Sequence, residues 1–136
     1  MKKKIAILGS TGSIGKTLIK ILEKDRNNFE INLLSTNKNI QELLKQIRKF
    51  KVKSIIVTNY QKFLSIKKIL KSKKINIYND FNQINIILKK KELDYTMNAI
   101  SGINGLSPTL EIIKFSKKIA IANKESIICG WSLIKK

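Results

Sequence analysis

Apolar and polar positions follow two alternating patterns along the chain. Short apolar runs that predict strands lie at 4–8, 30–35, 54–58, 75–78, 94–98 and 119–122. Segments with apolar residues three and four positions apart, which predict helices, lie between them at 14–24, 39–50, 60–72, 81–90 and 107–116. A further helical pattern begins near Lys124. This alternation predicts an α/β fold, a Rossmann-like, doubly wound and mostly parallel sheet with helices on both faces.

The domain organisation follows from the same pattern. No linker or repeat interrupts it, and Pro108 stands where the helix at 107–116 would begin, a position that tolerates its missing N–H. A length of 136 residues suits one domain. The last pattern, "KESIICGWSLIKK", stops without a following strand, so residues 1–136 are expected to be the N-terminal part of a longer protein. A complete small domain that ends in a simple helix is the alternative.

The stretch "GSTGSIGKT", residues 9–17, resembles two kinds of phosphate-binding loop. A P-loop needs Gly where Ser10 stands, so that interpretation fails by one position. Gly9, Gly12 and Gly15 instead have the spacing of a dinucleotide-binding loop, between the apolar run "IAIL" and an amphipathic helix. Glycines there permit a tight turn, close approach of a pyrophosphate and close packing of the helix on the strand. A glycine-rich turn without a ligand is the alternative.

The end of the second strand bears on which cofactor would bind. An NAD site has an acid there that accepts from the ribose 2′-hydroxyl, but "LLSTNKN", residues 33–39, contains none. The polar residues of this stretch can donate hydrogen bonds to a 2′-phosphate, and they are Ser35, Thr36, Asn37, Lys38 and Asn39. The sequence therefore favours NADPH. The alternative is a polar turn in which Asn39 only caps the next helix.

The chain is strongly basic. With 28 Lys and Arg against 9 Asp and Glu, its net charge is +19 and its pI is about 10.2. Such a charge is typical of nucleic-acid-binding proteins. However, the lysines are spread along the whole chain, and the aromatic residues Tyr60, Phe63, Tyr78 and Phe81 fall at positions expected in the core. We therefore expect a solvated basic surface and no nucleic-acid partner.

Other residue types exclude several classes of site. The chain has one cysteine, Cys129, expected as a small buried residue of the last helix, and it has no histidine. Neither a zinc cluster nor a Cys–His nucleophile pair can therefore form within it. No apolar run is long enough to span a membrane, and "MKKKIAILGS" lacks the apolar core of a secretory signal. A cytoplasmic protein is the expectation.

The C-terminal third carries the densest group of polar residues. Asn98–Gly102 and Ala122–Glu125 both follow predicted strands, at the sheet edge where open α/β folds bind ligands. Asn123, Lys124 and Glu125 place an amide, a cation and a carboxylate side by side before a helix. These groups suit a substrate phosphate and a nicotinamide ribose. In the alternative reading Asn123 only caps the helix and its two neighbours are solvated.

Three motifs occur in this order and spacing across almost the whole chain: "GSTGSIG", "SGINGLSPTL" and "IAIANKES". Together they resemble the N-terminal NADPH-binding domain of the 1-deoxy-D-xylulose 5-phosphate reductoisomerase family. The resemblance implies an enzyme that rearranges 1-deoxy-D-xylulose 5-phosphate and reduces the resulting aldehyde with NADPH. The product is 2-C-methyl-D-erythritol 4-phosphate, used for isoprenoid precursors. The resemblance also implies a divalent metal, Mg²⁺ or Mn²⁺, and a homodimer.

The resemblance implies roles for individual residues. Four residues would line the cofactor pyrophosphate: Thr11, Gly12, Ser13 and Ile14. Three would surround its 2′-phosphate: Asn37, Lys38 and Asn39. Asn123 and Glu125 would contact NADPH, and Lys124 would bind the phosphorylated sugar.

The chain departs from the family in two respects. The family usually has Gly where this chain has Asn37, and Asn is the next-best residue for a left-handed backbone. The family's metal-binding carboxylates, flexible lid and C-terminal domain lie beyond the equivalent of Lys136, so no catalytic or metal-binding residue is expected here, and the chain alone is expected to be inactive. Two alternatives are another NADP-dependent oxidoreductase, such as a semialdehyde dehydrogenase, and a non-catalytic nucleotide- or nucleic-acid-binding module.

Overall fold

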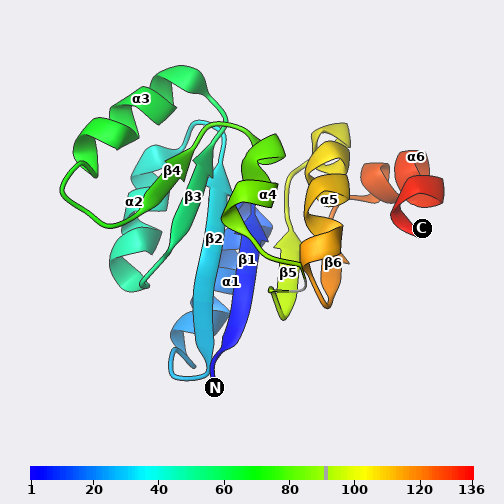
Figure 1. Cartoon of the computed structure of the whole chain (residues 1–136), viewed down its shortest axis with the longest axis horizontal. Coiled ribbons are helices and arrows are strands. Elements are labelled where there is room, and N and C mark those ends of the chain that lie inside the picture. The colour runs from blue at the N-terminus through cyan, green and yellow to red at the C-terminus, as the bar shows by residue number, and fades with distance from the viewer. Residues whose placement is uncertain (91) are drawn as a thin grey trace.

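The computed structural model of the chain describes residues 1–90 and 92–136. Within them, the strands form one sheet in the order β4-β3-β2-β1-β5-β6, and every neighbouring pair is parallel (Figure 1). The strands are β1 (Lys3–Leu8), β2 (Phe29–Thr36), β3 (Ser54–Val57), β4 (Asn76–Tyr78), β5 (Tyr95–Asn98) and β6 (Ile119–Ile121). The predicted parallel, doubly wound sheet is confirmed.

Helices follow the strands as predicted, with differences at their ends. The α-helices are α1 (Ser13–Glu23), α2 (Ile40–Lys49), α3 (Tyr60–Ile69), α4 (Ile84–Ile87), α5 (Leu106–Ile112) and α6 (Lys124–Ile134). Short 3-10 turns lie at η1 (Phe81–Gln83), η2 (Ile103–Gly105) and η3 (Ile113–Phe115). Pro108 lies in the first turn of α5, so its missing N–H breaks no helical hydrogen bond.

Each face of the sheet carries its own hydrophobic core. On one face, residues of β1 to β3 such as Ile7 pack with buried side chains of α1, α2 and α3. On the other face, Leu8 and its neighbours pack with Ile84 of α4 and Ile112 of α5. Each of these side chains is at most 1% exposed, and burial of one such side chain contributes roughly 1.5–3 kcal/mol. Burial on both faces explains why the strands read as continuous apolar runs.

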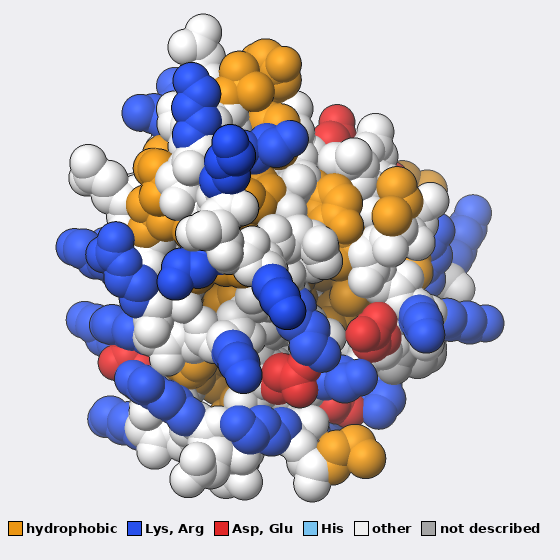
Figure 2. All heavy atoms as spheres, turned by 60° about the vertical axis from the view of Figure 1, so that its left-hand side comes forward, with side chains coloured by type: hydrophobic (Ala, Val, Ile, Leu, Met, Phe, Trp, Pro, Cys, Tyr) orange, Lys and Arg blue, Asp and Glu red, His pale blue; other side chains and the backbone are white. Residues whose placement is uncertain are grey.

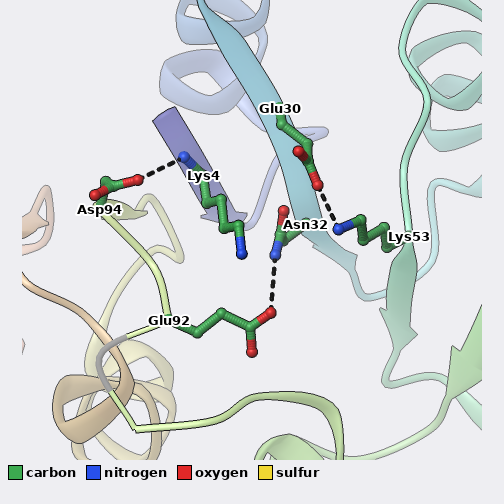
Figure 3. Close-up of polar contacts among 6 residues, drawn as sticks. All are labelled: Lys4, Glu30, Asn32, Lys53, Glu92 and Asp94. Carbon is green, nitrogen blue, oxygen red and sulfur yellow. Dashed lines mark hydrogen bonds and ion pairs between the residues drawn. The ribbon is translucent and has the colours of Figure 1, made fainter. Parts of the chain in front are cut away.

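An irregularity in β2 changes which face its side chains meet. The register against β1 shifts between Ile31 and Leu33, so Asn32 is an extra residue of β2, a β-bulge. Ile31 packs in the core with α1 to α3, whereas Leu33 packs in the opposite core. Asn32 is 2% exposed and donates a long hydrogen bond of 3.5 Å to the Glu92 carboxylate (Figure 3). The bulge explains why the side chains of "EINLLST" do not alternate regularly between the two faces of the sheet.

The predicted helix at 81–90 is wrong in extent. The chain forms a 3-10 turn and then the four-residue α4, and it becomes extended at Leu88. Leu88 is 5% exposed and packs in the core beside Ile84, which requires the chain to turn toward β5 early. Packing of Leu88 in the core therefore ends the helix that the sequence pattern predicted to continue to residue 90.

Two expectations about burial are also wrong. Tyr60 is 61% exposed, although Phe63, Tyr78 and Phe81 are partly buried against the cores as expected. Cys129 is exposed because α6 turns Ser126, Gly130 and Ile134 inward, and a cysteine one position before Gly130 lies off that stripe.

Candidate functional site

A cleft of about 810 Å³ opens at the carboxyl edge of the sheet. The strand order reverses there, because β2 to β4 continue from one side of β1 whereas β5 and β6 lie on the other. Such a switch point is where open α/β sheets bind ligands. Its walls come from the loop after β1, the end of β2, the turns after β3 and β4, the loop after β5 and the start of α5. Its volume is typical of a site for a small molecule or a cofactor.

The glycine loop after β1 forms the floor of this cleft. Gly9 has a φ of +73°, which favours glycine, and a side chain there would meet the backbone of Ala99 at 3.0 Å. A Cβ on Gly15 would lie 2.4 Å from the Gly9 carbonyl oxygen and 2.6 Å from the Cα of Ser10. Gly12 is less constrained, since its nearest such contact is 3.6 Å. Gly9 permits the turn, and Gly15 permits α1 to approach it.

The N-terminus of α1 follows the loop without a side-chain cap. Gly12 occupies the N-cap position, and the first intrahelical bond runs from the Lys16 N–H to the Gly12 carbonyl at 2.9 Å. The preceding N–H groups, of Ser13, Ile14 and Gly15, therefore have no acceptor within the helix. Ser13 and Ile14 are exposed. These N–H groups, at the positive end of the helix dipole, suit a phosphate.

Hydrogen bonds from the end of β2 hold the loop. The Gly9 N–H donates to Ser35 Oγ at 2.8 Å, and the Ser10 N–H donates to the Ser35 carbonyl at 2.9 Å. The hydroxyls of Thr11 and Thr36 are 2.7 Å apart. Ser35 is 1% and Thr36 is 4% exposed, so their hydroxyls serve mainly to fix the loop.

Gln46 of α2 supports the loop from the opposite side, and the sequence alone did not point to it. It is 1% exposed, and its Nε2 donates to the Ser10 carbonyl at 2.9 Å. Its Oε1 is buried without a hydrogen-bond partner among the described residues. The sequence signal that could have pointed to Gln46 is a polar residue on the otherwise apolar, buried face of an amphipathic helix.

Asn37, Lys38 and Asn39 lie between β2 and α2, and all three are exposed. Asn37 lines the cleft, and its Oδ1 accepts from the Thr58 hydroxyl at 3.1 Å. Asn39 caps α2, accepting from the Glu42 N–H at 3.1 Å, so the capping role considered for it is confirmed. In both amides the oxygen is used within the protein, which leaves the Nδ2 group available to an acceptor.

The wall on the β5 side is built around two buried asparagines. Asn98 is fully buried, and its Nδ2 donates to the Gly105 carbonyl at 2.8 Å and to Thr109 Oγ1 at 2.5 Å. Asn123 caps α6 through its Oδ1, which accepts from the Ser126 N–H at 2.9 Å. Asn123 is 6% exposed, and its Nδ2 has no hydrogen-bond partner among the described residues. A Cβ on Gly105 would lie 2.3 Å from that nitrogen, so the start of α6 packs directly on this wall.

Lys124 and Glu125 begin α6. Lys124 is exposed and Glu125 is half-buried, and neither lies directly on the cleft surface. No group of three or more Cys, Asp and Glu residues that could hold a metal ion occurs in the described part of the chain. The same part contains no helix long and apolar enough to cross a membrane.

Of the residues that the sequence put forward for phosphate binding, the cleft surface includes Gly9, Thr11, Gly12, Ser35, Thr36 and Asn37, whereas the other predicted site residues are not among those that line it. It adds residues that the sequence had not singled out, among them Thr58, Asp80, Phe81 and Glu111. Thr58 and Asp80 follow β3 and β4, and parallel strands bring all their carboxyl ends to one edge, so strand order was the signal that could have found them.

Comparisons with known proteins agree with this geometry. A family model described as 1-deoxy-D-xylulose 5-phosphate reductoisomerase matches residues 5–130. The 1-deoxy-D-xylulose 5-phosphate reductoisomerase of Pelagibacter ubique (strain HTCC1062) is 58% identical over 135 residues, which are 98% of this chain and 35% of that protein. The one from Phocaeicola vulgatus is 35% identical over 134 residues, with the same coverage of both proteins.

Solved structures are similar as well. The reductoisomerase of Zymomonas mobilis in complex with NADPH superposes with a TM-score of 0.88 and 25% identity, over 98% of this chain and 35% of that one. A reductoisomerase in complex with NADPH, fosmidomycin and magnesium superposes with a TM-score of 0.86 and 26% identity, over 98% of this chain and 33% of that one. The chain therefore spans about 35% of the length of the curated relatives that it matches.

Proposed function

The chain belongs to the 1-deoxy-D-xylulose 5-phosphate reductoisomerase family, and on that premise we propose that it is the NADPH-binding portion of such an enzyme. The whole enzyme would convert 1-deoxy-D-xylulose 5-phosphate to 2-C-methyl-D-erythritol 4-phosphate. The observation that carries the proposal is the cleft at the switch point, floored by a glycine loop and the uncapped N-terminus of α1. This combination suits a dinucleotide pyrophosphate.

The glycine loop is proposed to hold the pyrophosphate. The residues involved are Thr11, Gly12, Ser13 and Ile14. The first-turn N–H groups of α1 lack intrahelical acceptors, and a phosphate oxygen would satisfy them at the positive end of the helix dipole. Gln46 and Ser35 hold the loop in place before any ligand arrives, which lowers the entropic cost of binding.

The turn after β2 is proposed to recognise the 2′-phosphate. Lys38 supplies an exposed cation, and the free Nδ2 groups of Asn37 and Asn39 supply donors. A cation and two amides, with no acid within residues 37–39, favour NADPH over NADH, since NADH offers only a hydroxyl at this position.

The start of α6 is proposed to meet the other end of the cofactor. The Asn123 Nδ2 is buried without a partner among the described residues, and a buried donor left unpaired is costly, so a cofactor oxygen is a suitable acceptor. Glu125 would bind the same portion of NADPH, and the exposed Lys124 would bind the phosphorylated sugar. NADPH, once bound, supplies the hydride for the reduction.

We propose that the metal of the enzyme binds outside this part of it. Mg²⁺ and Mn²⁺ prefer oxygen ligands, and the described residues offer no cluster of carboxylates. We therefore assign the metal ligands, which would polarise the substrate oxygens, to the remainder of the enzyme. A homodimer and a cytoplasmic location are further parts of the proposal and rest on the family resemblance.

Titration of the purified chain with NADPH and, separately, with NADH tests this function. Cofactor fluorescence and thermal shift would both report binding. We expect NADPH to bind about tenfold or more tightly than NADH, since hydrogen bonds to a charged group contribute about 1.5–3 kcal/mol. Lys38→Ala should remove most of that difference, whereas Lys45→Ala, which removes an exposed cation from α2, should not.

Equal affinity for the two cofactors would contradict the assignment of the turn after β2. No binding of either cofactor by a chain with the circular dichroism of a folded α/β protein would contradict the proposed function itself.

A further inference from the structure

A second concavity lies at the opposite edge of the sheet from the cofactor cleft. Its volume is about 670 Å³, and it is formed where β2 and β3 begin, beside the end of α2. Its lining, within the described part of the chain, includes six cationic side chains and one carboxylate, Glu30. The cations are Lys2, Arg26, Lys49, Lys51, Lys53 and Lys74. We call this concavity the amino-edge groove.

The sequence places these cations through a repeated feature. Lysines stand immediately before or at the start of strands, as in "MKKKIAIL", "KVKSIIV" and "KSKKINIY". Because all the strands are parallel, their amino ends meet at one edge, and the lysines of β1, β3 and β4 gather there. Figure 2 shows Lys and Arg side chains over the whole face that it presents, with Asp and Glu side chains among them mainly in its lower half.

Part of this charge is already neutralised. Lys53 forms an ion pair with Glu30 at 2.5 Å (Figure 3), and Lys49 forms one with Glu23 at 2.7 Å. Lys2, Lys51 and Lys74 are exposed and form no ion pair with any described residue. A local excess of at least three positive charges therefore remains in the groove.

The excess of positive charge does not extend to the cleft at the carboxyl edge. The cofactor cleft of the same chain is lined by no Lys or Arg among the described residues, and its ionisable lining groups are the carboxylates of Asp80 and Glu111. The two concave surfaces thus have opposite charge.

The floor of the groove is apolar. Phe29, Phe50 and Val52 line it, and the Arg26 guanidinium lies 5.4 Å from the centre of the Phe50 ring. Cations beside a wall of low dielectric constant attract anions more strongly than cations on an open surface. Phosphate oxygens accept charge-assisted hydrogen bonds from ammonium and guanidinium groups.

We propose that the amino-edge groove binds a polyphosphate chain, as a site separate from the cofactor cleft. Several adjacent phosphates match several unpaired ammonium groups, whereas a single monoanion would leave most of them unused. The volume accommodates a molecule of small-ligand size. The phosphate chain belongs either to inorganic polyphosphate or to a nucleotide, whose base could lie on the apolar floor.

Calorimetric titration of the chain with tripolyphosphate tests the proposal, at low and at physiological salt. The groove variant replaces Lys2, Lys51 and Lys74 with Gln. A matched variant replaces Lys45, Lys62 and Lys68 with Gln. These lysines are exposed outside the groove lining, so the matched variant has the same net charge as the groove variant. We expect the wild type to bind and the groove variant to bind roughly tenfold more weakly, since each exposed ion pair contributes modestly. The matched variant should stay within about twofold of the wild type, because distant exposed charges are screened.

Equal weakening in the two variants would overturn the proposal, since binding would then follow net charge alone. The proposal would also be overturned if the folded chain did not bind tripolyphosphate at low salt. A chain that bound a single-stranded RNA oligonucleotide but not tripolyphosphate would overturn it as well. ATP binding more tightly than tripolyphosphate would support the site with a nucleotide as its ligand, and equal binding would support it with the phosphate chain alone. NADPH titration of the groove variant should match the wild type, which separates this site from the proposed function.

Discussion

Individual glycines decide the shape of the loop after β1, for different reasons. Gly9 adopts a backbone conformation that L side chains rarely adopt, while Gly15 lies against the backbone of Gly9 and Ser10. Backbone atoms move aside less easily than a flexible side chain, so an atom added at Gly15 would force α1 or the loop to shift. Gly12 has an ordinary backbone conformation and open surroundings.

Gly15→Ala should therefore destabilise the chain much more than Gly12→Ala. The added methyl group at residue 15 would lie 2.4 Å from the Gly9 carbonyl oxygen, and overpacking of this kind costs about 1–3 kcal/mol. At residue 12 the nearest contact of 3.6 Å is ordinary, and a change from Gly to Ala at an N-cap costs about 1 kcal/mol or less. Urea unfolding would measure both, and equal losses would show that α1 can shift away from the loop.

At the scale of elements, each strand end and the helix that follows it are joined by a short polar turn. Asn39, Asn59 and Asn123 cap α2, α3 and α6 through the same geometry, in which Oδ1 accepts from the N–H three residues later. Asn59, unlike Asn39, has no proposed contact with the cofactor. It therefore separates the stability that a cap provides from any role in binding.

Asn39→Ala and Asn59→Ala should each lower the free energy of unfolding by about 1 kcal/mol, since each loses one cap. Only Asn39→Ala should also weaken NADPH binding, because its Nδ2 is proposed to meet the 2′-phosphate. The pair would be compared by urea unfolding and by NADPH fluorescence titration. If both variants bound NADPH as the wild type does, Asn39 would be a cap alone.

A carboxylate joins three strands at the amino edge. Asp94, just before β5, accepts from the Lys117 ammonium at 2.7 Å and from the Lys4 backbone N–H at 2.9 Å (Figure 3 shows the second contact). The hydrogen bond from Lys117, followed by that from Lys4, holds the pKa of Asp94 below its ordinary value of 3.8. The ionised form therefore stabilises the fold above that value, and the stabilisation is lost as the pH falls through the lowered pKa.

Asp94→Asn should accordingly lower the Tm at neutral pH, with a difference from the wild type that shrinks as the pH falls below 3.8. Thermal unfolding followed by circular dichroism across this range would measure it. Lys117→Gln should reproduce part of the loss and leave the contact with Lys4. A difference that did not change with pH would show that the carboxylate acts through shape and not through charge.

At the scale of the whole molecule, the concave surfaces at the two edges of the sheet differ in charge. The carboxyl edge carries the cofactor cleft, and the amino edge carries the lysines. The outer face of α6 exposes Ile127, Ile128, Trp131 and Leu133. The chain spans about 35% of the length of its curated relatives.

The chain alone should therefore not consume NADPH when 1-deoxy-D-xylulose 5-phosphate and Mg²⁺ are supplied. The reason is that its described residues provide no carboxylate cluster for the metal. Absorbance of NADPH over time would measure this, with a full-length reductoisomerase as the positive control. Metal-dependent loss of NADPH absorbance above the blank would place catalytic groups within this chain.

Periodicity and the glycine spacing by themselves determined the order of the elements, the parallel sheet and the position of the glycine loop. They did so because these features depend on residues near one another in sequence. Tertiary structure alone decided the rest. The early end of α4 depends on packing of Leu88, the exposure of Cys129 depends on which stripe of α6 faces inward, and the bulge at Asn32 exchanges the faces of β2. The support of the glycine loop by Gln46 and the separation of charge between two sheet edges depend on residues that only the fold brings together.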